Sequence, residues 1–147
     1  MKEKTARRVR IACFAAAALM ALLALAFRMP WRGAEGNAAE GRIAFLADCG
    51  WEVDPASEEL KSVLIPDCGA GVMADYNALQ LRQGYDLSAW EGRTVTQVSY
   101  RVTNYPGYAG TVWAVLYVSG RRVIGGDIHS AALNGFMHGL RRDAGGG

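Results

Sequence analysis

The hydrophobic pattern divides the chain into two parts, and the first contains an apolar run that begins at Ile11 and ends at Phe27. At about 1.5 Å per helical residue this run is roughly 26 Å long, close to the ~30 Å hydrocarbon layer of a bilayer. The ten residues before it contain five Lys or Arg and one acidic residue, which favours a cytoplasmic N-terminus. We therefore predict a single-pass signal anchor in the cell membrane, with the C-terminal domain outside the cell.

A cleaved signal peptide is the alternative interpretation of the same run. Ala24, Leu25 and Ala26 resemble the small-residue pattern of a cleavage site. This pattern lies inside the apolar run, however, and no polar region precedes the cut. We favour the uncleaved anchor, and cleavage would instead give a secreted domain.

The rest of the chain predicts one small domain. We assign residues 1–10 to a basic cytoplasmic N-terminus and residues 28–39 to a polar, glycine-containing linker. Residues 40–142 then form an extracytoplasmic domain of about 100 residues, enough for one modest hydrophobic core. Residues 143–147 have nothing to bury, so we expect a disordered tail.

The first third of this domain mixes helical and extended patterns. Residues 38–48 are compatible with a helix, and Gly50 is placed to end it. Residues 51–53 and 59–65 alternate as strands do, with Pro55 as a break between them.

A second helix is predicted over residues 70–83. Its expected inner stripe follows the spacing i, i+4, i+7 and i+11, with Val72, Tyr76, Leu79 and Gln83. Residues 86–92 follow as a single turn with Asp86 as its N-cap.

The final third has the two-residue period of strands. Residues 94–102 alternate apolar and polar side chains, whereas residues 111–118 are apolar on both faces, as expected for a central strand covered on both sides. Residues 121–128 complete a meander, and Gly125-Gly126 indicates a bulge or a close backbone contact. We expect residues 133–140 to pack back as a turn or short helix. The predicted fold is α+β, a three- or four-stranded antiparallel sheet packed by two or three helices.

Charge separates the two parts and excludes one class of function. The formal net charge is +2, but residues 33–147 contain nine basic and thirteen acidic residues. Nucleic-acid binding needs a basic face on the folded domain, and the acidic domain offers none, so we predict no nucleic-acid partner.

Three cysteines are present, one in the apolar run and two in the domain. Cys49 and Cys68 lie in a compartment where disulfides persist, and a bridge between them is one interpretation. Two buried free thiols are the second. A redox or metal pair is the third, although neither a Cys-x-x-Cys motif nor a neighbouring histidine supports it.

One group of residues suggests metal chemistry. Asp127 and His129 stand two positions apart in a predicted strand and so share a face, over which His138 could fold back. A carboxylate and two imidazoles are an accepted ligand set for zinc or iron. Their spacing matches no established motif, so we predict no cofactor and no catalytic residue. Ser130 adjoins His129, but adjacent strand residues point to opposite faces.

Polar and aromatic residues suggest a recognition surface instead. Tyrosine and amide side chains can bind an extended peptide or a glycan, although they also support turns. The candidates are Tyr76, Asn77, Gln80, Tyr85 and Tyr105.

Several short motifs together resemble a bacterial family, the domain of unknown function numbered forty-eight-thirty, over about residues 42–140. The resemblance implies an extracytoplasmic α+β domain in small membrane-anchored or secreted proteins of Clostridia-like Gram-positive bacteria. It implies no enzyme activity. The motifs are Phe45-Leu46, Gly50-Trp51-Glu52-Val53, Ile65-Pro66, Tyr76-Asn77-Ala78-Leu79-Gln80, Gln83-Gly84-Tyr85-Asp86-Leu87-Ser88, Asn104-Tyr105-Pro106, Ile124-Gly125-Gly126-Asp127-Ile128 and Gly135-Phe136-Met137-His138-Gly139-Leu140.

We therefore expect a non-catalytic binding or interaction module of the cell envelope, tethered by residues 11–27. Its partner would be an envelope protein or a cell-wall component. The alternative is a metal-dependent envelope enzyme that uses Asp127, His129 and His138.

Overall fold

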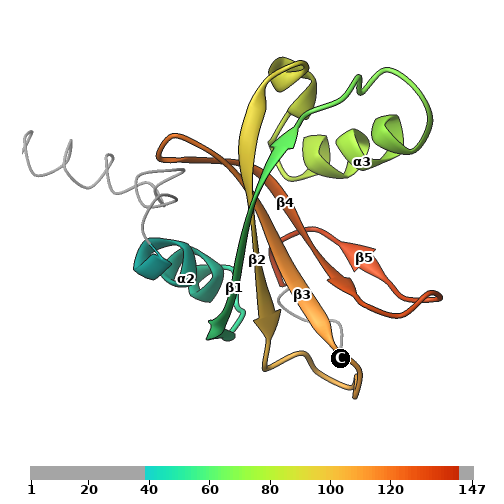
Figure 1. The fold of residues 1–147 in the computed structure, drawn as a ribbon. Coiled ribbons are helices and arrows are strands. Elements are labelled where there is room, and N and C mark those ends of the chain that lie inside the picture. Colours follow the sequence, from blue (N-terminus) through green and yellow to red (C-terminus); the bar gives the residue numbers. More distant parts are fainter. Residues whose placement is uncertain (1–38, 143–147) are drawn as a thin grey trace, which may run out of the picture. The chain divides into compact units, whose positions relative to one another are not determined.

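The computed structural model describes residues 39–142, which form an α+β domain around one antiparallel sheet (Figure 1). The predicted membrane helix and the predicted tail lie outside the described residues. Within residues 39–142, no helix is long and apolar enough to cross a membrane.

The sheet is a five-stranded meander in which each strand pairs with the next one along the chain. The α+β class and the meander agree with the sequence, but the expected three or four strands were too few. One helix precedes the sheet, and a helix and a 3-10 helix connect the first two strands. The elements are α2 (Ala39–Asp48), β1 (Val53–Leu64), α3 (Gly71–Arg82), η1 (Leu87–Trp90), β2 (Thr94–Val102), β3 (Val112–Ser119), β4 (Arg122–Ser130) and β5 (Met137–His138).

Two features of the sheet differ from the expectation: β1 is one continuous strand, and the C-terminal segment adds a fifth strand. Pro55 does not break β1, because the strand bulges around it: Asp54 pairs with Arg101 and Glu59 with Ser99, which leaves four residues of β1 opposite one of β2. The C-terminal segment contributes a two-residue strand instead of the expected turn or short helix. A strand this short has no periodic pattern that the sequence could show.

The bulge also directs a carboxylate towards α2. Arg42 of α2 is only 4% exposed, and its Nη2 donates to Glu58 Oε2 at 2.7 Å. Its Nε donates to the Tyr100 hydroxyl at 3.0 Å, and that hydroxyl donates to Glu58. Burial opposes ionisation of Glu58, but the bonds from Arg42 and Tyr100 outweigh it and lower its pKa. This buried network fastens α2 to the first two strands.

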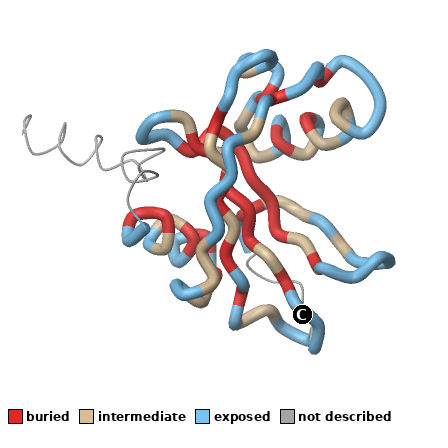
Figure 2. Tube along the Cα trace, viewed as in Figure 1, coloured by how far each residue is buried: buried red, intermediate tan, exposed pale blue. Residues whose placement is uncertain are grey.

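Two hydrophobic clusters lie on opposite faces of the sheet, and the buried positions concentrate along the central strands (Figure 2). Leu116 of β3 packs in the cluster with Leu46 of α2, whereas its neighbour Tyr117 packs in the cluster with Met73 of α3. Because adjacent strand residues point to opposite faces, the two helices cover different sides. The larger cluster includes Leu46, Trp51, Tyr100, Leu116, Ile128 and Leu140, and the smaller one consists of Ile65, Cys68, Leu87, Val95 and Ile124 with half-buried neighbours.

The inner face of α3 differs from the predicted stripe. Val72 is 83% exposed, so it does not face the sheet. The residues that α3 buries are Asn77 and Gln80, which are polar. The predicted stripe is therefore wrong at Val72 and misses Asn77 and Gln80, whereas Tyr76 and Gln83 do contact the sheet.

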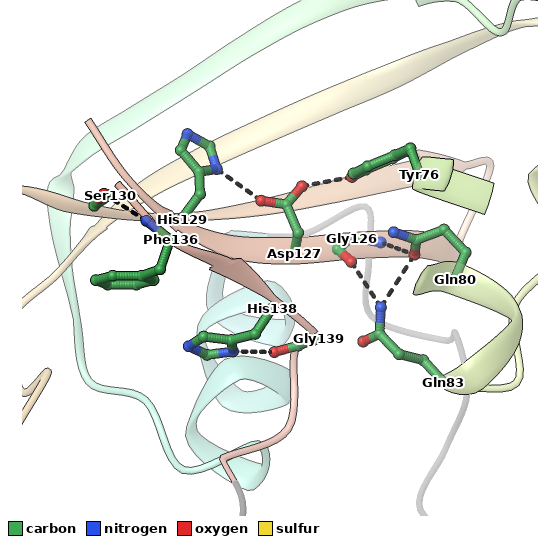
Figure 3. Close-up of polar contacts among 10 residues, drawn as sticks. All are labelled: Tyr76, Gln80, Gln83, Gly126, Asp127, His129, Ser130, Phe136, His138 and Gly139. Atoms are coloured by element: carbon green, nitrogen blue, oxygen red, sulfur yellow. Dashed lines mark hydrogen bonds and ion pairs between the residues drawn. The ribbon is translucent and has the colours of Figure 1, made fainter. Parts of the chain in front are cut away.

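The side chains of Gln80 and Gln83 complete the backbone hydrogen bonding of β4 at Gly126 (Figure 3). The Gly126 N–H donates to Gln80 Oε1 at 2.9 Å, and Gln83 Nε2 donates to the Gly126 carbonyl at 3.0 Å. Gln83 Oε1 also accepts from the Leu140 N–H at 2.6 Å. A Cβ on Gly125 would lie 3.0 Å from Gln80 Oε1. The predicted close contact at Gly125-Gly126 is confirmed.

We predict that Gly126→Ala destabilises the domain by about 3 kcal/mol through overpacking. The added Cβ would lie 2.3 Å from the Val115 carbonyl oxygen, which is backbone and has little freedom to move. Urea unfolding measures the change in the free energy of unfolding.

The matched control is Gly107→Ala, where φ is +68° and no atom lies within 4 Å. This variant should lose only the about 1–2 kcal/mol expected for a side chain in the left-handed region. Equal losses in the two variants would contradict the close-contact explanation.

Candidate functional site

A buried carboxylate links α3 to the exposed part of the sheet. Asp127 is 3% exposed, and its Oδ2 accepts from the Tyr76 hydroxyl at 2.5 Å. Its Oδ1 lies 2.6 Å from His129 Nδ1. The same-face placement of Asp127 and His129 agrees with the two-residue strand period (Figure 3).

The side chains around Asp127 differ in how readily they lose a proton and in how far they are exposed to solvent. Burial, with Asp127 beside it, raises the pKa of the Tyr76 phenol far above its usual range, so Tyr76 remains a proton donor. The hydrogen bond to Asp127 raises the pKa of His129, although burial opposes this effect. The His129 side chain is 31% exposed. Its Nε2 has no partner among the described residues, so it is available to a ligand.

His129 belongs to a line of side chains that crosses the sheet. Arg101 pairs with Trp113, and Trp113 pairs with His129. Directly opposed residues in antiparallel strands have side chains on one face about 4.5–5.5 Å apart. We call Arg101, Trp113 and His129 the cross-strand row; Asp54 and Met137 continue it at the two edges.

Both ends of the cross-strand row are held in place, whereas its centre is free. Arg101 Nη2 binds Asp54 Oδ2 at 2.5 Å, and Asp127 binds His129. Trp113 is half-buried. Among residues 39–142, neither its ring nor its indole N–H has an aromatic, cation–π or hydrogen-bond partner. An indole flanked by two polar side chains can stack on an apolar ligand face while its N–H forms a hydrogen bond.

His138 does not join Asp127 and His129. It pairs with Ile128 of β4 and therefore lies on the opposite face of the sheet. Its Nε2 lies 2.9 Å from the Tyr105 hydroxyl, and its Nδ1 lies 2.8 Å from the Gly139 carbonyl. In the part of the chain that the structure describes, no three His, Cys, Asp or Glu residues lie close enough to hold a metal ion.

Tyr105 instead belongs to a packed layer of rings. It stacks on Trp51 with centroids 5.3 Å apart and on Phe136 at 4.7 Å. Tyr108 meets Phe136 edge-on at 5.2 Å. With neighbours on two sides, the Tyr105 ring acts mainly to fasten the C-terminal segment.

The other predicted recognition residues support the fold. The Asn77 side chain accepts from Leu87 N–H at 2.8 Å and donates to Asp86, so it orients η1. Gln80 is fully buried against Gly126, and its Nε2 has no partner in the described residues. Tyr85 is half-buried against the larger cluster. The predicted set therefore does not form one exposed surface.

The two domain cysteines are buried free thiols. Cys49 packs in the larger cluster and Cys68 in the smaller one. Burial raises the pKa of both thiols, which disfavours the reactive thiolate. The structure therefore agrees with the interpretation of two buried free thiols, and it contains no disulfide between Cys49 and Cys68.

Sequence reasoning missed the cross-strand row. The segment around Trp113 is apolar at every position, which led to the prediction of a strand covered on both faces. The useful signal was the polar face of the preceding strand, where Gln97, Ser99 and Arg101 alternate with apolar residues. Polar residues beside Trp113 indicate that this face is partly open.

A comparison with protein-family models matches residues 45–128 to the domain of unknown function DUF4830. No curated protein and no solved structure matches the chain.

We predict that Asp127→Asn lowers the pKa of His129, because the hydrogen bond to the carboxylate is the main cause of its elevation. The His129 contribution to stability is complete below the ordinary pKa of ~6.5. It is lost as the pH rises through the higher folded-state value.

NMR titration of the histidine ring protons measures this shift, and His129→Gln assigns the signal between the two histidines of the chain. Asp75→Asn, which removes an exposed charge on α3, is the control and should leave the titration unchanged. An unchanged His129 pKa in a folded Asp127→Asn variant would exclude the proposed coupling.

Proposed function

The chain belongs to the DUF4830 family, whose function is unknown, and we propose that it is a membrane-tethered extracytoplasmic module that binds a component of the cell envelope. The tether is the apolar run from Ile11 to Phe27. The binding surface is the cross-strand row.

The proposal of a tether is supported by the length of the apolar run and by the five basic residues before it. The acidic composition of residues 33–147 accords with a role away from nucleic acids. The buried thiols of Cys49 and Cys68 are compatible with an oxidising compartment, since neither is exposed to form a bridge with another molecule.

The observation that carries the binding proposal is the free surface of Trp113 between two fixed polar side chains. Binding sites commonly combine an aromatic surface with a few placed polar groups. Arg101 offers guanidinium donors, and His129 offers Nε2, which accepts a hydrogen bond when neutral and donates one when protonated. This set suits a saccharide or an extended peptide of the envelope.

A catalytic role has less support. His129 and Asp127 resemble a base and its orienting carboxylate, but the adjacent Ser130 points to the other face and its hydroxyl accepts from Phe136 N–H at 3.1 Å. The metal-dependent alternative loses its third ligand because His138 binds Tyr105. We therefore favour binding without catalysis.

We predict that a cysteine placed in the domain is accessible from outside the cell. Asn134→Cys, at an exposed loop position, should react with a membrane-impermeant maleimide in intact cells. Thr5→Cys, before the apolar run, should react only after lysis. The reverse labelling pattern would exclude the proposed orientation.

We predict that Trp113→Ala weakens binding of the full chain, in mild detergent, to purified Gram-positive cell walls by about tenfold or more, or ~1.4 kcal/mol. Loss of the indole removes the stacking surface without changing the backbone pairing. Co-sedimentation measures the bound fraction.

The matched control is Trp90→Ala in η1, which removes another half-buried tryptophan, one that Arg93 covers at 5.3 Å. This variant should bind as the wild type does. Normal binding by a folded Trp113→Ala variant, or no binding by the wild type, would contradict the proposal.

A further inference from the structure

An open β-sheet presents unpaired backbone groups at its edges, and these groups can pair with another strand. The strand order places β1 at one edge and β5 at the other. The two edges of this sheet differ in how far their backbone N–H and carbonyl groups are covered.

The outer side of β4 is covered over residues 126–130. β5 pairs with Ile128 and His129, and the side chains of Gln80 and Gln83 bind the N–H and the carbonyl of Gly126. These contacts leave little backbone for another strand.

The first half of β1 is also unsuited to pairing. Pro55 has no N–H, the bulge interrupts the regular spacing, and Arg42 of α2 holds Glu58. Prolines and bulges at edges are known protections against strand addition.

The second half of β1 contains neither a proline nor a bulge, although it carries the exposed pair Glu59 and Lys61, whose Oε2 and Nζ lie 3.5 Å apart. Residues 59–64 pair with β2 in unbroken register and contain no proline. On their other side, no strand of the described residues pairs with them. Leu60 is 55% exposed and Leu64 is 62% exposed. With Ser62 between them, these leucines lie on one face by the two-residue strand period.

We propose that residues 59–64 form a homodimer interface in which the β1 edges of two copies pair antiparallel, so that one sheet continues through both copies. The two-fold axis passes through Ser62. Leu60 of each copy then lies opposite Leu64 of the other, which covers four exposed leucines.

Charge and shape disfavour the two registers that lie nearer the bulge. With the axis at Lys61, two lysines would lie directly opposite one another, which is unfavourable. With the axis at Leu60, the pairing would extend into the bulge at residues 55–58. With the axis at Ser62, Lys61 lies opposite Val63 of the second copy. An isologous interface needs this self-complementarity, and the inference does not depend on the proposed envelope ligand.

The test is register-specific crosslinking of the full chain in its membrane. Cys13 is first replaced by serine, and Cys49 and Cys68 stay buried. In this background, Ser62→Cys should give a covalent dimer as the main product of mild oxidation, because the two sulfurs face each other across the axis.

Glu59→Cys is the matched control. It lies opposite residue 65 of the second copy, so its two copies are about 20 Å apart at ~3.4 Å per residue and should not crosslink. Leu60→Cys and Leu64→Cys should each fail alone but crosslink to each other when co-expressed.

A second measurement does not depend on disulfide geometry. In detergent, the wild type should sediment as a dimer, and Leu60→Lys should sediment as a folded monomer. A monomeric wild type, or Ser62→Cys dimers no more abundant than those of Glu59→Cys, would overturn the proposal and leave the edge to another partner, such as an extended peptide.

Discussion

The contact of Gln80 in α3 and of Gln83, the residue that caps this helix, with the backbone of Gly126 determines how the domain is assembled. Gln80 and Gln83 take the place of a neighbouring strand, because they bind both polar groups of one residue at the β4 edge. Glycine is required there, since a Cβ on Gly126 would meet the Val115 carbonyl. The same contact sets the position of α3 and therefore puts Tyr76 within reach of Asp127. The shape of the site thus follows from a requirement of backbone hydrogen bonding.

The second constraint is the small number of covering elements. A five-stranded sheet has two faces and two edges, and α2, α3 and η1 are too short to cover all of them. Within residues 39–142, the parts left open are the face around Trp113 and the edge of β1 beyond the bulge. Both proposals concern these areas, because association with another molecule can bury surface that the chain does not bury itself. One area carries mixed polar and aromatic groups, and the other carries leucines and bare backbone.

Local patterns predicted much of the fold. The alternation in β2, the end of α2 near Gly50 and the Asp86 cap of η1 all depend on neighbours in sequence, and the structure contains each of them. The family assignment from short motifs is also confirmed. Features that depend on distant residues were not predictable. Gln80 is buried because the Gly126 N–H needs a hydrogen-bond acceptor. His138 lies on the opposite face from His129 because of the register between β4 and β5. No local sequence pattern encodes either feature.

The C-terminal segment has a consequence for the order of folding. Leu140 is 1% exposed in the larger cluster, its carbonyl accepts from Trp51 Nε1 at 2.5 Å, and its N–H binds Gln83. One late residue thus joins the start of the domain to its middle. Since synthesis runs from the N-terminus, a nascent chain lacks this closure until almost all of the domain has left the ribosome. The larger cluster is therefore completed only when the last part of the domain has been made.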